Sequence, residues 1–172
     1  GSPHVFRDYI ELKKSTPEYA DPLSLVVGKA SYMYDTYSLG ILLFYAITGR
    51  RLRGRILFNF LVLQELYNMV SPVKAFIVEN PDLANHMNKI LSILKDYKLK
   101  KISYSELINV SMDYIEEIDK EPFSELKKLV NPDFAEVISK SISLDLSKRY
   151  KDAIAMWLDI LKFTESYGYR NL

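Results

Sequence analysis

A cluster of arginines is the densest group of chemically capable side chains in the sequence: Arg50, Arg51, Arg53 and Arg55. Guanidinium groups bind phosphate and carboxylate through forked pairs of donors. The cluster is therefore a candidate anion patch for phosphate or an acidic partner. The alternative is a solvated loop in which two of the arginines pair with the carbonyl end of the preceding helix.

Two adjacent hydroxyl groups, Ser15 and Thr16, follow Lys13 and Lys14. Phosphorylation of either hydroxyl would add negative charge beside the lysines, so both are candidate modification sites. The alternative for Thr16 is a hydroxyl that caps a turn.

Acidic residues gather at Glu116, Glu117, Asp119 and Glu121, but they lack the glycine and the alternating spacing of a calcium-binding loop. We interpret them as a solvated face. The sequence has no cysteine and only two histidines, His4 and His86, far apart. No metal site is therefore predicted.

The elements that would position these groups are helical, because apolar residues recur at three- and four-residue spacing and no stretch alternates as a strand would. We predict an all-α fold. Its expected parts are a loop at 4–30, a buried central helix at 31–49, helices within 51–130 and C-terminal helices at 131–165. The stretch 37–47 is apolar on nearly every face, which indicates a helix buried all round. A break in the third helix of the middle region is expected near Pro122.

Three motifs, in order, resemble the C-terminal lobe of eukaryotic-type serine/threonine protein kinases. They are Thr16-Pro17-Glu18-Tyr19, then Asp35-Thr36-Tyr37-Ser38-Leu39-Gly40, and finally Asp145-Leu146-Ser147-Lys148-Arg149. The resemblance spans residues 15–50 and 131–162. It implies a single helical subdomain over 4–172, with an activation-segment-like loop at 4–30 and an enlarged, divergent helical insertion at 51–130.

The resemblance also implies roles for individual residues. Thr16, Pro17, Glu18 and Tyr19 would form the loop beside the substrate, whereas Asp35, Gly40 and Arg149 would be structural. The glutamate that pairs with the late arginine in the family is replaced by Leu23. Arg149 therefore needs another acceptor, and Glu18 and Asp21 are the candidates nearest to that position in the sequence.

The parts of a kinase that handle phosphate are missing from this sequence. No Gly-x-Gly-x-x-Gly loop, strand lysine, catalytic aspartate or metal-binding aspartate occurs in its family context. We therefore predict no catalytic residue and no cofactor in this chain, with ATP and magnesium bound only if a missing N-terminal part exists. The expected function is the helical, substrate-side platform of a longer kinase. The alternative is an interaction module, either a standalone pseudokinase relative or an unrelated helical bundle.

The composition of the chain limits which partners it is expected to bind. The 172 residues are 48% hydrophobic with a net charge of +1, which fits a compact domain without a general attraction to nucleic acid. No membrane span is expected, and we predict a cytoplasmic protein whose first three residues are a cloning scar. The absence of cysteine is typical of proteins from hot environments. Expected partners are the missing kinase half, another protein, or a second copy through exposed apolar surface.

Overall fold

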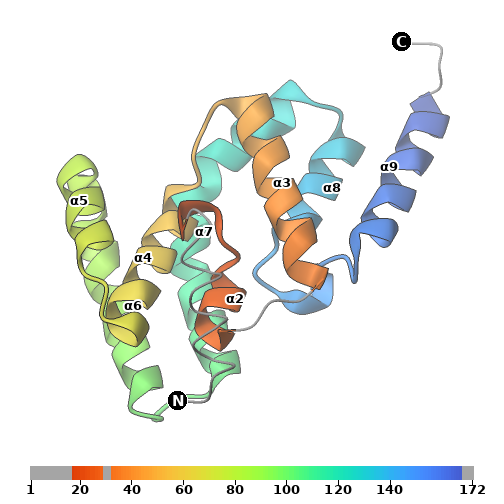
Figure 1. The fold of residues 1–172 in the computed structure, drawn as a ribbon. Helices are drawn as coiled ribbons and strands as arrows, with labels where there is room; N and C mark the ends of the chain where they lie inside the picture. Colours follow the sequence, from red (N-terminus) through yellow and green to blue (C-terminus); the bar gives the residue numbers. More distant parts are fainter. Residues whose placement is uncertain (1–16, 29–31, 168–172) are drawn as a thin grey trace. The chain divides into compact units, whose positions relative to one another are not determined.

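The computed structural model describes residues 17–28 and 32–167, and all regular structure within these ranges is helical. The predicted all-α class is therefore confirmed. The chain forms two compact units. Of the described residues, 17–28 and 52–120 form unit 1, and 32–51 and 121–167 form unit 2. Figure 1 shows the helices coloured along the chain.

Unit 1 is organised around α4 (Arg53–Tyr67), on which η1 (Pro17–Tyr19), α2 (Pro22–Val27), α5 (Ser71–Glu79) and α6 (Ala84–Lys98) pack. Every residue of α4 from Gly54 to Leu63 is buried. A helix buried on all faces must be apolar all round or have its polar groups paired inside the protein. α4 is therefore the central helix of unit 1, a role that the sequence pattern predicts for residues 31–49.

Unit 2 contains α3 (Tyr32–Thr48), α8 (Pro132–Ser141), η3 (Leu146–Lys148) and α9 (Ala153–Tyr167), with α3, α8 and α9 in mutual contact. The core of this unit includes Val137, Tyr150 and Met156. The expectation that α3 is buried all round was wrong, because Leu39, Leu42 and Tyr45 on one side of α3 are exposed. Local hydrophobicity could not show how many neighbours the helix would have.

The helix α7 (Tyr104–Leu129) contributes to both units, since the boundary between them falls after Lys120. It begins at the predicted capping box, in which the Ser103 hydroxyl accepts from the Glu106 amide at 3.1 Å. The break expected near Pro122 does not occur, and α7 continues through this residue. Packing on both sides of Pro122 holds the helix together: Asp119 lies in the core of unit 1, and Phe123 packs edge-on against Phe44 in unit 2.

The loop expected at 4–30 contains helices in its described part. Asp21 caps α2 by accepting from the Leu23 amide at 3.0 Å, and Pro22 lies at the start of the helix, where its missing N–H is not needed. The helix ends at Gly28, whose positive φ of 73° suits glycine. Local capping thus outweighs the prolines that suggested an extended chain.

None of the helices in the described ranges is both long and apolar enough to cross a membrane.

α3 approaches α8 closely at Gly40. A Cβ atom placed there would collide with the side chains of Ser141 and Ile142. In an exposed helix interior, glycine to alanine stabilises by up to about 1 kcal/mol. We expect Gly40→Ala to destabilise the protein instead, by about 1–3 kcal/mol from overpacking, as measured by urea unfolding.

The matched control is Leu42→Ala on the exposed side of α3, which should change stability by no more than about 0.5 kcal/mol. A Gly40→Ala variant more stable than the parent would contradict the close approach of α3 and α8.

Candidate functional site

Two of the three kinase-like motifs meet inside unit 2. Arg149 is buried, and its guanidinium carbon lies 4.8 Å from the centre of the Tyr37 ring on α3. Its Nε donates to the carbonyl of Ser143. A planar cation over an aromatic face is attractive, and more so where water is excluded. We call Arg149, Tyr37 and Ser143 the Arg149 cluster.

The turn that carries Arg149 is fixed by its own polar residues. The Asp145 carboxylate accepts from the amide and the hydroxyl of Ser147, at 3.0 and 2.6 Å. These two donors lower the pKa of Asp145. The adjacent Tyr150 donates to Asp159 on α9 at 2.8 Å, and burial raises the pKa of its hydroxyl. The turn therefore connects α8 to α9 with little freedom.

The other structural residues expected from the resemblance also lie on α3. Asp35 is exposed in the first turn of the helix, where the helix dipole favours an acidic side chain. Gly40 faces α8 at the close approach described above. Asp35, Gly40 and the Arg149 cluster thus belong to one unit.

The first motif lies in unit 1. Ser15 and Thr16, the predicted phosphorylation sites, fall outside the described residues, so their role stays a prediction. Pro17, Glu18 and Tyr19 form η1 on α4. The side-chain amide of Asn59 fixes this segment by donating to the carbonyls of Pro17 and Ala20, at 3.0 and 2.8 Å.

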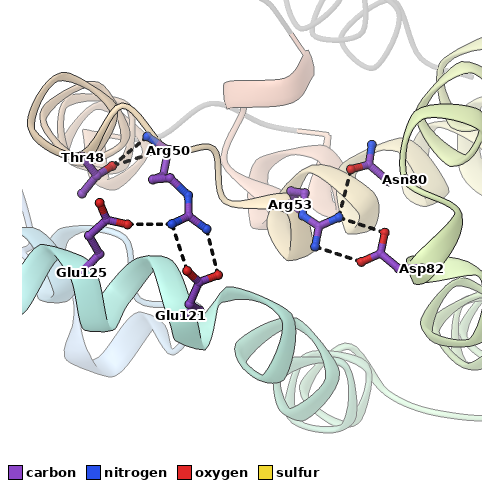
Figure 2. Close-up of polar contacts among 7 residues, drawn as sticks. All are labelled: Thr48, Arg50, Arg53, Asn80, Asp82, Glu121 and Glu125. Atoms are coloured by element: carbon purple, nitrogen blue, oxygen red, sulfur yellow. Dashed lines mark hydrogen bonds and ion pairs between the residues drawn. The ribbon is translucent and has the colours of Figure 1, made fainter.

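The candidate anion patch separates into distinct ion pairs, and Figure 2 shows those of Arg50 and Arg53. In unit 2, Arg50 binds Glu121 and Glu125, with nitrogen to oxygen distances of 2.8 and 2.6 Å. The hydrogen bonds that Arg50 donates to these carboxylates, the one to Glu121 first, raise the pKa of Arg50. Thr48 orients the same segment by accepting from the Arg50 amide.

In unit 1, Arg53 forms a two-pronged pair with Asp82 at 3.1 and 3.0 Å and also donates to the side chain of Asn80. The hydrogen bond from Arg53 lowers the pKa of Asp82. The pair is exposed, so it contributes little to stability. Arg51 is exposed in the segment between these pairs.

Arg55 is buried and pairs with Asp119 at 2.9 Å. Asp119 also accepts from the amides of Gly54 and Arg55, at 2.7 and 3.2 Å, and so caps α4 from a distant part of the chain. Leu52, at the N-cap position, provides no side-chain acceptor. Burial raises the pKa of Asp119, while Arg55 and the two amides act in the opposite direction.

Asp119 had been interpreted as part of a solvated acidic face, and that interpretation was wrong. The sequence contained one signal of its burial. Asp119 falls in the three- and four-residue spacing of the buried side of α7, which comprises Ile108, Ser111, Ile115, Asp119, Pro122 and Leu126. A carboxylate in an apolar stripe requires a partner inside the protein.

These arginine side chains therefore bind carboxylates of the same chain. Arg50, Arg53 and Arg55 each already pair with a carboxylate of this chain. Within the described residues, no group of three histidine, cysteine, aspartate or glutamate side chains is arranged to hold a metal ion.

Comparison with known proteins gave no match: no family model, no curated protein and no solved structure matches this chain.

The Arg55–Asp119 pair predicts a large difference between buried and exposed carboxylates. Asp119→Ala removes both the counter-charge of Arg55 and the cap of α4, so it should cost about 3–5 kcal/mol in urea unfolding. The control Asp82→Ala, which removes the partner of Arg53, should cost less than about 1 kcal/mol.

A double variant, Arg55→Met with Asp119→Asn, retains an acceptor for the α4 amides and removes both charges. It should recover much of the stability that Asp119→Ala loses. Equal losses of stability for Asp119→Ala and Asp82→Ala would show that the buried pair contributes no more to the free energy of unfolding than the exposed pair does.

The Arg149 cluster predicts that Arg149→Ala destabilises unit 2 by about 2 kcal/mol or more, because the stacking on Tyr37 and the bond to Ser143 are both lost. Lys148→Ala is the control, since Lys148 is the exposed neighbour in the same turn. Thermal unfolding followed by circular dichroism measures both. A loss no larger than that of Lys148→Ala would argue against the cluster.

Proposed function

We propose that this chain is the helical part of a serine/threonine protein kinase-like C-terminal lobe, which supplies the substrate-side platform of a longer kinase and is not catalytic by itself. The observation that carries the proposal is the Arg149 cluster. It brings Arg149 of the late motif against Tyr37 of the middle motif, although 112 positions (149 − 37) separate them in the sequence. Chance matches between two short motifs give no reason for such a contact.

Two further features of the chain are consistent with a platform that supports a substrate. Gly40, in the middle motif, permits the close approach of α3 and α8. The segment Pro17–Tyr19 is fixed on α4 by Asn59, which would hold a substrate-side loop in place. Under this proposal the protein is cytoplasmic, and the residues that bind ATP and magnesium belong to the missing kinase half.

A second candidate is a non-catalytic interaction module, either a standalone pseudokinase relative or an unrelated helical bundle. The exposed apolar side chains Leu39, Leu42 and Tyr45 on α3, together with those on α9, favour this alternative. A module of this kind would bind protein and have no requirement for nucleotide.

The experiment that tests the proposal begins with the intact mass of the native polypeptide captured from its source cells. That native species and the 172-residue chain are then compared for a thermal shift with magnesium-ATP and for phosphate transfer to a basic protein substrate. We expect a larger native species that binds nucleotide, whereas the isolated chain shows neither a shift nor transfer, because it lacks a phosphate-binding loop.

A native species near 20.0 kDa without a nucleotide response would support the interaction module instead. Phosphate transfer by the 172-residue chain alone would contradict both candidates.

A further inference from the structure

The turn that joins α6 to α7 in unit 1 carries several lysines close together. α6 ends at Lys98 and α7 begins at Tyr104, so residues 99–103 lie outside both helices. The acidic side chains of this region are Asp96, partly buried on α6, and Glu106, exposed in the first turn of α7. Its exposed lysines, none of which forms an ion pair within the described residues, are Lys95, Lys98, Lys100 and Lys101.

Ser103 is an exposed serine that follows these lysines and immediately precedes α7. Lys101, Lys100 and Lys98 lie two, three and five positions before it. A protein kinase with an acidic substrate groove recognises basic side chains just before a hydroxyl, because charge complementarity orients the segment and selects it over other sequences. The lysine spacing therefore fits a phosphorylation site.

The Ser103 hydroxyl acts only as an acceptor within the described part of the chain. Its Oγ accepts from the Glu106 amide at 3.1 Å, and the Ser103 amide donates to the Glu106 carboxylate at 3.4 Å. The hydroxyl proton is therefore available to a base. Ser105 is also exposed, but it lies inside α7, where a helical backbone cannot extend along a substrate groove.

We propose that Ser103 is phosphorylated by a separate protein kinase whose substrate groove is acidic, with ATP as the donor. The bond between phosphorus and the Ser103 Oγ forms while the bond between phosphorus and the departing ADP oxygen breaks. The hydroxyl proton passes to a base of that kinase. The inference depends on residues of unit 1 alone, so it can fail or hold independently of the kinase-like function.

Phosphorylation would change the charge of the turn. A phosphoserine carries a charge of about −1.5 to −2 at neutral pH and accepts hydrogen bonds from lysine. The phosphate would attract Lys100 and Lys101 and would repel Glu106, whose carboxylate accepts from the Ser103 amide. The excess positive charge of the turn would then be largely cancelled.

The sequence contains a second hydroxyl with the same lysine spacing, so the test has to separate the two. Thr16 follows Lys13 and Lys14 and lies outside the described residues. Ser15→Ala and Thr16→Ala are therefore present in every chain used below.

The first test incubates the folded 172-residue chain with magnesium-ATP and a protein kinase that selects serines after two basic residues. We expect the uptake of one phosphoryl group, placed on Ser103 by tandem mass spectrometry. Ser103→Ala should abolish this uptake, whereas the control Ser105→Ala should retain it. Phosphate on Ser105 in place of Ser103, or no uptake at all, would overturn the proposal.

The second test concerns the lysines. Lys100→Ala with Lys101→Ala should lower kcat/KM for the phosphorylation by about tenfold or more, because two charge pairs with the acidic groove are lost. The control is Lys127→Ala with Lys128→Ala, an exposed lysine pair in the last turn of α7, which should leave the rate unchanged. Equal rates for the two double variants would contradict recognition through the lysines.

The third test separates recognition of the sequence from access in the folded protein. A synthetic peptide of residues 95–107 and the folded chain should both be phosphorylated on Ser103. Modification of the peptide but not of the folded chain would show that the turn is closed to the kinase in the native protein, and it would overturn the proposal.

Discussion

The structure of unit 1 depends on the carboxylate of Asp119, buried at the N-terminal end of α4. Ten consecutive buried residues, Gly54 to Leu63, follow Arg53 in that helix, so the amides at its start are shielded from water. Asp119 accepts from two of them and neutralises Arg55 at the same time. The cost of burying this charge is offset only while all three donors are in place, and this requirement sets the position of α7 against α4.

Unit 2 also contains a buried charge, but there the charge is the Arg149 cation and no carboxylate is among the groups described around it. The buried cation of Arg149 is held by an aromatic face and a backbone carbonyl, while the absence of a side chain at Gly40 lets α3 and α8 approach closely. Since α7 contributes to both units, Pro122 lies between two packed stretches of one helix. The cost of a proline there, about 3 kcal/mol, is met by packing before and after it.

The distribution of charge and apolar surface separates the parts of the molecule that hold it together from those that could bind something else. Arg50, Arg53 and Arg55 are committed to carboxylates of the same chain, although in the sequence they form the most conspicuous candidate ligand site. Exposed apolar side chains lie on α3, at Leu39, Leu42 and Tyr45, and on α9, at Ile154, Trp157 and Leu158.

Local interactions were the part of this structure that the sequence determined by itself. The all-helical class, the capping box at Ser103 and the helix start at Asn131, whose side chain accepts from the Asp133 amide at 2.9 Å, each depend on residues within one or two turns. Tertiary structure alone decided which helix is central, whether the chain breaks at Pro122 and which partner pairs with Asp119. Those outcomes depend on partners such as Arg55 and Asp119, 64 positions apart (119 − 55), and periodicity along a single helix gives the direction of a face without identifying what covers it.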